Sequence, residues 1–305
     1  MHIHGVEVED TFAEAFKMWG ARLIITAVDH RWARIAAQEA TGFATSVIAC
    51  GAEAGIEREL PASETPDGRP GISILVFTMG SKGMQEQLMN RVGQCIMTCP
   101  TTACFDGLRE GDKAVKVGGQ LRYFGDGYQI SKLLEGRRLW RIPVMEGEFL
   151  VDETVNIQRA VGGGNFLILG NTAVATLAAA EAAVEAVRAV DGVTAPFPGG
   201  IVRSGSKTWS KYKFLRASTN SAYCPTLRGQ VESALPAGVN SVLEIVIDGL
   251  SEEAVAEATR VGVEAACRPG IVRISAGNYG GTLGQYQFHL HELLVNGEQR
   301  MTDDE

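Results

Sequence analysis

The sequence lacks any apolar run long enough to cross a bilayer, and its first residues, MHIHGVEVEDTF, have neither a basic flank nor an apolar signal core. We therefore expect a soluble cytoplasmic protein without a membrane partner. Lys and Arg are also in short supply, because 28 of them stand against 36 Asp and Glu, which gives a net charge of -8. Nonspecific binding to nucleic acid needs a surplus of cations, so no nucleic-acid partner is expected.

Cysteine is sparse, and the six thiols of a chain without a secretion signal are expected to be reduced. The spacing of Cys95, Cys99 and Cys104 suggests a metal, but a stable zinc site needs a fourth ligand. The nearest candidates, His289 and His291, lie far along the chain. Buried or partly buried thiols are the better interpretation, and we expect neither a metal nor a prosthetic group.

Signatures of the common catalytic motifs are missing as well. No dinucleotide or P-loop fingerprint follows a predicted strand, and no Ser-His-Asp or Cys-His pattern identifies a covalent nucleophile. We interpret the glycine clusters at 162–164, 199–200 and 277–281 as tight turns that let a ligand or a second backbone come close.

What the chain does contain is an alternation of strand and helix patterns. The predicted strands cover residues 22–28, 46–48, 72–77, 96–98, 165–169, 200–203, 242–247 and 271–275. The predicted helices begin near residue 30 and cover residues 82–95, 173–190 and 251–267. The order of elements is therefore the same in the two halves of the chain.

At 305 residues the chain exceeds what one hydrophobic core usually serves, so two lobes are expected. We predict an α+β fold, a tandem duplication of ferredoxin-like lobes with mostly antiparallel sheets, fused through a shared interface. Hairpin-like insertions at 121–144 and 204–238 interrupt both halves at matching places and favour this fold over one doubly wound parallel sheet. The predicted lobes are 1–148 and 149–296, followed by a polar tail at 297–305.

One window departs from the acidic average. Residues 192–231 contain no Asp or Glu, and they hold Arg203, Lys207, Lys211, Lys213, Arg216 and Arg228. Aromatic residues lie between these cations, namely Trp209, Tyr212, Phe214 and Tyr223. A flat heterocycle with carboxylate or phosphate tails would suit such a surface. The alternative is a solvated subunit interface that pairs with acidic surface elsewhere, and a nucleic-acid site fits less well.

Glu244 is the second signal, because it interrupts the apolar stretch SVLEIVI of a predicted strand. Strand alternation places its side chain on one face with Val242 and Val246. Burial among apolar side chains favours the neutral acid, which can donate a hydrogen bond to a developing oxyanion. The alternative is a glutamate paired with an Arg or Lys of a neighbouring strand.

Several long polar segments are not explained by a helix or strand pattern. They are 8–16, 39–43, 64–71, 124–128, 195–202, 217–220, 222–226 and 274–278. Together these segments resemble those of the formylmethanofuran:tetrahydromethanopterin formyltransferases, from the N-terminus to about His291.

The resemblance implies the tandem ferredoxin-like fold and reversible formyl transfer between the amine of methanofuran and N5 of tetrahydromethanopterin. These two compounds are the expected cosubstrates, and Glu244 occupies the place of the family glutamate near the formyl carbon. The cations of the acid-free window are expected to bind the anionic tails of these two compounds. The residues expected to bind them are Arg203, Lys207, Lys211, Lys213, Phe197, Gly199, Gly200, Ser218, Thr219, Asn220 and Tyr223.

The resemblance also implies a homodimer or homotetramer. Cys99, Cys104, a short loop at 80–83 and the polar tail depart from the archaeal pattern and indicate a bacterial methylotroph relative. Such relatives resemble subunits of a hetero-oligomeric formyltransferase/hydrolase complex. The mechanistic hypothesis is direct attack of one amine on the formyl carbon, with protonated Glu244 and backbone N–H groups holding the oxyanion. The competing hypothesis is a noncatalytic pterin-binding scaffold or delivery subunit of a formyl hydrolase complex.

Overall fold

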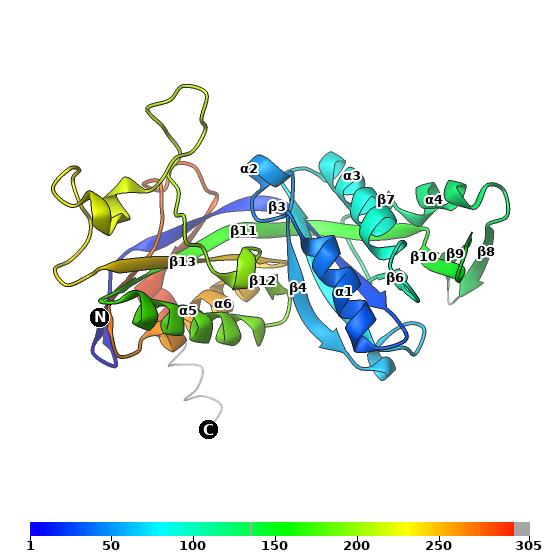
Figure 1. Ribbon diagram of the computed structural model, residues 1–305, viewed down its shortest axis with the longest axis horizontal. Helices are drawn as coiled ribbons and strands as arrows, with labels where there is room; N and C mark the ends of the chain where they lie inside the picture. Colours follow the sequence, from blue (N-terminus) through cyan, green and yellow to red (C-terminus); the bar gives the residue numbers. More distant parts are fainter. Residues whose placement is uncertain (135, 296–305) are drawn as a thin grey trace.

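The computed structural model describes residues 1–134 and 136–295, so the predicted tail at 297–305 lies outside the described residues. Two long strands, β3 (Phe12–Thr26) and β11 (Thr154–Gly170), run along the middle of an elongated molecule (Figure 1). They pair antiparallel with each other from Phe16 to Gly20. Each strand then continues into a different half of the molecule, so one continuous sheet joins the halves.

The N-terminal half places its strands in the order β4, β5, β3, β6, with helices on one face. Alanines of α1 pack closely on apolar strand residues such as Ile25 and Ile74, which are fully buried. Asp29 caps α1 by accepting a hydrogen bond from the backbone N–H of Trp32 at 3.0 Å. These elements are β4 (Glu53–Leu60), β5 (Gly71–Thr78), β6 (Ala103–Asp106), α1 (His30–Thr41), α3 (Ser81–Arg91) and the π-helical turn η2 (Val92–Ile96).

The C-terminal half repeats the order as β12, β13, β11, β14. Its helices, α5 and α6, lie together on one face, where Gly262 lets α6 approach because a Cβ there would lie only 3.0 Å from Phe166 and Val187. Thr172 and Ser251 cap the two helices through their hydroxyl groups. The elements are α5 (Ala173–Arg188), β12 (Val193–Thr194), β13 (Ser241–Gly249), α6 (Glu252–Ala266) and β14 (Ile271–Ser275).

The remaining elements extend this sheet or connect its parts. The added strands are β1 (His2–Ile3), β2 (Val6–Val8), β7 (Lys113–Lys116), β8 (Ile130–Leu134), β9 (Arg137–Val144), β10 (Gly147–Asp152) and β15 (Tyr286–His289). The short helical pieces are α2 (Val47–Cys50), α4 (Gly118–Leu121), η1 (Ala62–Glu64), η3 (Arg122–Gly125), η4 (Pro198–Gly200), η5 (Ser221–Tyr223) and η6 (Pro225–Leu227). Among the described pairs only β14 with β2 and β10 with β6 are parallel. The fold is therefore mixed α/β with a mostly antiparallel sheet, and the doubly wound parallel alternative is wrong.

Three predicted strands are wrong. Residues 46–48 form α2, because Ser46 caps this single turn and Gly51 ends it in the left-handed conformation. Residues 96–98 continue α3 through the π-helical turn, and the strand of that unit begins only at Ala103. Residues 200–203 form the end of η4 and one isolated bridge from Val202 to Glu244.

Two further expectations need correction. The glycines at 162–164 lie inside β11, where the register shifts in a β-bulge, and do not form a tight turn. Gly162 is needed there because a Cβ would lie 2.0 Å from the sulfur of Met18. The insertion at 121–144 does contain the hairpin of β8 and β9. The insertion at 204–238 has only short 3-10 turns and isolated bridges in the described chain, so it is not a regular hairpin.

A buried pair of carboxyl groups joins the halves. Glu53 begins β4 and Asp248 lies near the end of β13, and the two buried carboxyl groups lie close enough for their charges to interact. Backbone N–H groups of Val47 and Gly163 donate to Glu53 and Asp248 at 3.0 and 2.8 Å. Burial raises the pKa of both carboxyls, and the charge of Glu53 raises the pKa of Asp248 further. The pair therefore retains a proton when exposed carboxyls are ionised.

We predict that the free energy of unfolding falls as the pH rises across this pair, and that Asp248→Asn reduces the fall. The folded-state pKa values lie above the unfolded values of about 4, so the stability is complete below that pH and is lost as the pH rises through the folded values. One proton corresponds to about 1.4 kcal/mol per pH unit. Urea unfolding at about pH 5 and about pH 8 measures this slope. Exposed Glu86→Gln is the control, and equal slopes in the parent and Asp248→Asn would contradict the prediction.

Candidate active site

Glu244 lies in the middle of β13, opposite Leu167 of β11. Its neighbours Ile245 and Ile247 face α5 and α6, so strand alternation places the Glu244 side chain on the sheet face without these helices. On its other edge the backbone of Glu244 exchanges two hydrogen bonds with Val202, at 2.8 and 3.0 Å. The backbone of Glu244 is therefore held on both edges, by β11 and by the segment around Val202.

Burial raises the pKa of Glu244 from its ordinary value to about 7. Within residues 1–134 and 136–295, no ion pair or side-chain hydrogen bond involves this carboxyl. The alternative of a cation paired with Glu244 therefore does not hold for the described chain. A carboxyl in this state is a mixture of neutral and ionised forms at neutral pH, and the neutral form carries a proton that it can donate.

A cavity of about 680 Å³ opens beside Glu244. Three of the predicted binding residues, Arg203, Asn220 and Tyr223, line it together with Glu244. Apolar side chains of Leu167 and other residues form part of the wall, and Tyr223 packs on the cluster of Leu167, Leu169 and Val239. The site thus combines one titratable carboxyl, one guanidinium and one aromatic ring around a space that holds a small molecule.

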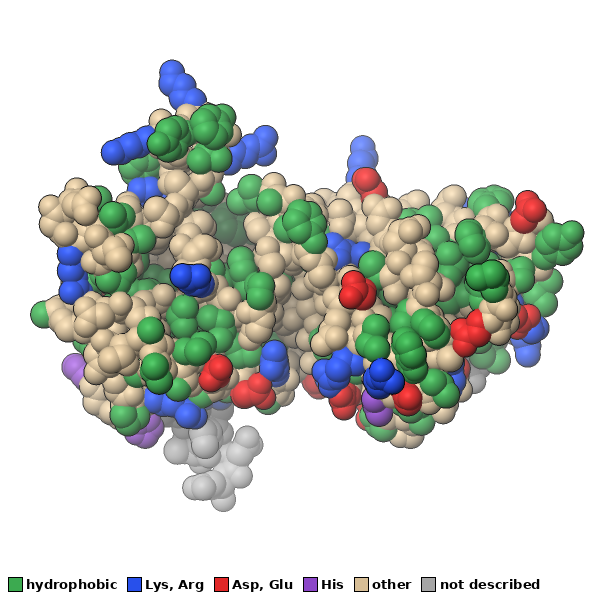
Figure 2. Space-filling model, in the orientation of Figure 1, with side chains coloured by type: hydrophobic (Ala, Val, Ile, Leu, Met, Phe, Trp, Pro, Cys, Tyr) green, Lys and Arg blue, Asp and Glu red, His purple; other side chains and the backbone are tan. Residues whose placement is uncertain are grey.

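The other predicted cations do not reach this cavity. Lys207 donates to the hydroxyl of Ser221 at 2.8 Å and lies 4.1 Å over the ring of Trp209. Lys211 and Lys213 lie on the exposed tip of the segment that projects from the C-terminal half, where Figure 2 shows Lys and Arg side chains around apolar ones. Their charge is therefore presented to solvent, beyond the cavity.

The polar residues at the base of this segment also have local partners. The hydroxyl of Ser218 donates to the backbone carbonyl of Trp209 at 2.6 Å, and the hydroxyl of Thr219 lies 3.4 Å from the sulfur of Cys224. Cys224 itself lines the cavity. Ser218 and Thr219 thus shape the segment that carries Asn220 and Tyr223, and neither lines the cavity.

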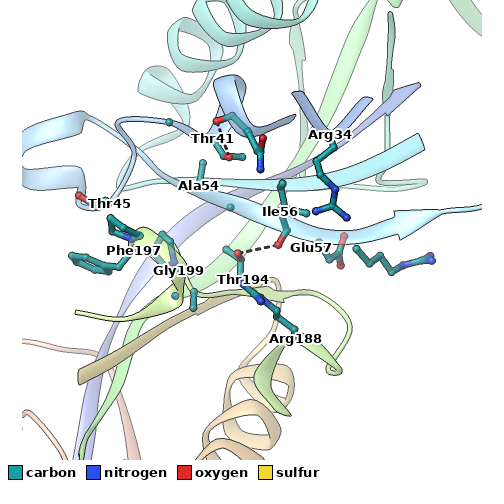
Figure 3. A pocket seen from close by; sticks show the side chains of 18 of the residues that line it. Arg34, Thr41, Thr45, Ala54, Ile56, Glu57, Arg188, Thr194, Phe197 and Gly199 are labelled. Carbon is teal, nitrogen blue, oxygen red and sulfur yellow. Dashed lines mark hydrogen bonds between the residues drawn. The ribbon is translucent and has the colours of Figure 1, made fainter. Parts of the chain in front are cut away.

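Phe197, Gly199 and Gly200 line a second cavity of about 610 Å³, shown in Figure 3. It lies between the halves, with Arg34, Ile56 and Glu57 on one side and Thr194 and Arg188 on the other. Gly200 has a φ of +85° and leaves no room for a side chain, because a Cβ would lie 2.8 Å from Val184. The chain then continues through Ile201, Val202 and Arg203, which line the first cavity. One short segment therefore borders both cavities.

Sequence reasoning missed Glu14, which lies in β3 and has 1% of its surface exposed. Its carboxylate accepts hydrogen bonds from the backbone of the 277–284 loop, at 2.6 Å from Tyr279 and 2.6 Å from Leu283. The signal was available, because Glu14 interrupts the apolar strand FAEAF in the same manner as Glu244 interrupts its strand.

The described residues contain no group of three or more His, Cys, Asp or Glu side chains able to hold a metal ion. Cys95, Cys99 and Cys104 are free thiols, and burial raises the pKa of all three. In the described part of the chain, no helix combines the length and the apolarity that a membrane span requires.

Comparison with protein families gives two consecutive matches. The model described as formylmethanofuran-tetrahydromethanopterin formyltransferase matches residues 1–144. The model described as "FTR, proximal lobe" matches residues 147–293. Together they cover nearly all of the described chain.

Individual relatives match along their whole length. The formylmethanofuran--tetrahydromethanopterin formyltransferase of Methylococcus capsulatus is 59% identical over 299 residues, which is 97% of this chain and 100% of the relative. A solved formyltransferase of the same name from Methanosarcina barkeri has a TM-score of 0.92 at 52% identity, covering 96% and 100% of the two chains. A chain of the formyltransferase/hydrolase complex from Methylorubrum extorquens, solved with methylofuran, has a TM-score of 0.94 at 55% identity, covering 96% and 98%.

Proposed function

The chain belongs to the formylmethanofuran-tetrahydromethanopterin formyltransferase family, and from that premise we propose that Glu244 is the residue that stabilises the transition state of formyl transfer. The reaction moves a formyl group reversibly between the amine of methanofuran and N5 of tetrahydromethanopterin. The observation that carries the proposal is the unpaired Glu244 carboxyl, with a pKa of about 7, on the wall of a 680 Å³ cavity.

The proposed reaction is a direct transfer within a ternary complex. The lone pair of the acceptor nitrogen forms a bond to the formyl carbon, and the carbonyl π electrons move to the oxygen, which becomes an oxyanion. The oxyanion then re-forms the carbonyl, the bond to the donor nitrogen breaks, and the proton lost by the acceptor nitrogen goes to the donor nitrogen. Holding both cosubstrates in one site converts a bimolecular reaction into a step between bound groups.

Glu244 acts in this scheme as a hydrogen-bond donor. In the neutral form its O–H points a proton at the developing oxyanion, together with nearby backbone N–H groups, whereas the ionised form repels the oxyanion. Because its pKa is about 7, roughly half of the molecules carry the donor at neutral pH. No covalent intermediate with the protein is needed.

The cations and polar groups of residues 192–231 are proposed to bind the anionic tails and the flat ring of the cosubstrates. Arg203, Asn220 and Tyr223 act inside the first cavity, and Phe197, Gly199 and Gly200 act from the second. We assign Lys211 and Lys213 to the first encounter with an anionic tail, because both are exposed to solvent. Lys207 is assigned to the same encounter from the base of the segment, where it is partly buried and donates to Ser221. Ser218 and Thr219 are assigned to the shape of the segment.

Arg203→Ala is expected to raise KM for the anionic cosubstrate by about 10- to 100-fold, because a hydrogen bond to a charged group contributes about 1.5–3 kcal/mol. The value of kcat changes by less than about threefold, since the contact is equally present before and during transfer. Initial rates over a range of both cosubstrates measure the two constants.

Arg216→Ala is the matched control, because Arg216 belongs to the same acid-free window, is exposed and lies outside the cavity. Its KM is expected to stay within about threefold of the parent. If Arg203→Ala and Arg216→Ala had the same KM, the proposed role of Arg203 in binding would be contradicted.

The assembly and the shape of the lobes are also proposed. The relative from Methylorubrum extorquens is named as one of the subunits of a formyltransferase/hydrolase complex, which supports a hetero-oligomeric complex here. A homodimer or homotetramer is the alternative, and light scattering of the purified chain with and without its candidate partners distinguishes them. The repeated strand order of the two halves supports ferredoxin-like lobes with a boundary at 145–152.

The name of that relative also favours a second candidate function. In it, the chain binds the pterin and delivers formyl groups to a separate hydrolase without catalysing the transfer itself. A transfer assay on the isolated chain discriminates the two functions. Turnover by the isolated chain supports the enzyme, and tight pterin binding without turnover supports the carrier.

A further inference from the structure

Phe43 presents a large aromatic side chain to solvent in a backbone conformation that is strained. Its φ is +47°, in the left-handed region, and 80% of its surface is exposed. Three other non-glycine residues of the described chain have a positive φ, namely His4, Thr101 and Asp126, and all three are polar. A bulky apolar residue in this region is an outlier, because its Cβ crowds the following carbonyl oxygen. Such strain persists mainly where a site needs it.

The residues on both sides of Phe43 hold it in this conformation. The buried guanidinium of Arg91 donates a hydrogen bond to the backbone carbonyl of Gly42 at 3.2 Å. Ala44 is buried, and its carbonyl accepts from the backbone N–H of Ala54 at 2.9 Å. The chain cannot relax to a negative φ without breaking these contacts. Because the ring is mostly exposed, the strained conformation adds little to the packing of the core.

Phe43 and Phe197 line the same cavity of about 610 Å³, one from each half of the chain. In Figure 3, Thr45 marks the segment of Phe43, and Phe197 lies in the segment that borders the cavity from the other half. Pro196 and Pro198 flank Phe197 and restrict its backbone. Among the described residues no ring contact joins Phe43 and Phe197, so both rings are free to contact a ligand.

Contacts in the wall of this cavity fix the separation of the halves. A Cβ on Gly55 would lie 2.1 Å from the hydroxyl oxygen of Thr194, so β4 and β12 approach each other closely. The hydroxyl of Thr194 donates to the carbonyl of Ile56 at 3.4 Å, and the backbone N–H of Gly192 donates to the buried carboxylate of Glu57 at 2.8 Å. The two aromatic side chains are therefore carried by walls already in place before a ligand arrives, which lowers the entropic cost of binding.

We propose that Phe43 and Phe197 form an aromatic clamp, which holds one flat ring of a cosubstrate in the cavity between the halves. A flat ring between two phenyl groups stacks on both of its faces and leaves water, and this gain is what the strained backbone of Phe43 serves. The inference rests on the proposed function in one respect, that the ligand is a cosubstrate. Tetrahydromethanopterin and methanofuran both carry flat rings, and the experiment separates these two sources.

Binding of each cosubstrate alone to variants of the full chain tests the aromatic clamp. Phe43→Ala and Phe197→Ala are each expected to raise the Kd of the same cosubstrate by about 5- to 50-fold, because each removes one stacking face. Phe43→Tyr keeps a flat ring, so its Kd is expected to stay within about threefold of the parent. Calorimetric titration with tetrahydromethanopterin alone and with methanofuran alone identifies the cosubstrate that the clamp holds.

The stability of the same variants separates a binding role from a structural one. Phe43→Gly is expected to keep or raise the urea midpoint of the parent, because glycine adopts the left-handed conformation without strain and the ring it removes is mostly exposed. Its Kd rises as in Phe43→Ala. Phe124→Gly is the matched control, because Phe124 is 65% exposed, has no positive φ and lines neither cavity. This control is expected to lower the midpoint and to leave both Kd values within about twofold.

Unchanged Kd values for both cosubstrates in Phe43→Ala would overturn the inference, and so would losses of different cosubstrates in Phe43→Ala and Phe197→Ala. A midpoint that falls in Phe43→Gly as far as in Phe124→Gly would make Phe43 a structural residue and also overturn it. These measurements need no turnover, so either result leaves the proposed role of Glu244 intact. A parent chain that binds neither cosubstrate would instead count against the proposed function.

Discussion

Glu244→Ala is expected to lower kcat for formyl transfer by about 100- to 1,000-fold, because removal of one oxyanion donor typically has this effect. The KM values for both cosubstrates stay within about threefold, since the hydrogen bond forms only as charge develops on the oxygen. Single-turnover rates with saturating cosubstrates, together with binding measurements, separate the two effects.

Glu244→Gln is the informative companion variant. Its amide keeps the size of the side chain and still donates a hydrogen bond, though a weaker one, so its kcat is expected to lie between those of the parent and Glu244→Ala. Glu232→Gln is the matched control, because Glu232 is exposed and follows the same acid-free window. Full activity in Glu244→Ala would remove this residue from the mechanism.

The transfer rate is expected to fall about tenfold per pH unit above about pH 7, which gives about 100-fold by pH 9. The sign follows from the raised pKa of Glu244, which is about 7. Below this value the acid is neutral and donates its proton, and above it the carboxylate forms and cannot donate. The profile of kcat against pH, with both cosubstrates saturating, measures the limb.

Glu244→Gln provides the control for this profile, because an amide does not titrate over this range. Its rate is lower than that of the parent but is expected to stay flat through the same pH values. A parent-like fall in Glu244→Gln would assign the limb to another group.

The helices could be predicted from the sequence because each has a helical hydrophobic pattern, and α1, α5 and α6 are also preceded by a capping residue, whereas α3 begins after Gly80 without a side-chain cap. Ser251 before α6 is one example, and the alanine-rich α5 is another. Strand β4 was missed because its sequence, EAGIEREL, has four charged residues in eight. These charges are paired in three dimensions, for instance Glu57 with Arg22 and Arg58 with Glu64. The local sequence does not indicate which residues will form ion pairs with the charges of β4.

The long strands were predicted too short for a related reason. The first part of β11 pairs with β3 from the other half of the chain, and its glycines at 162–164 suggest a turn when taken alone. Only the contacts of Gly162 with Met18 and Asp248 explain why glycine is required inside a strand. The full length of these strands therefore depends on pairing between distant segments, which local propensity does not reveal.

The candidate site was predictable in part. Glu244 stood out as an acid in an apolar strand, and Arg203, Asn220 and Tyr223 line the same cavity. The three lysines do not, because the charge of a segment says nothing about the direction in which it leaves the sheet. Glu14 was not singled out, since its hydrogen bond from the backbone of Tyr279 joins residues 265 positions apart in the chain.

The most direct measurement is the pKa of the Glu244 carboxyl in the parent protein without cosubstrates, taken from the carbon shift that disappears in Glu244→Gln. The account predicts a value of about 7, so that the acid is still partly neutral where exposed glutamates are ionised. A value near 4.5, the ordinary value for a glutamate, would contradict it.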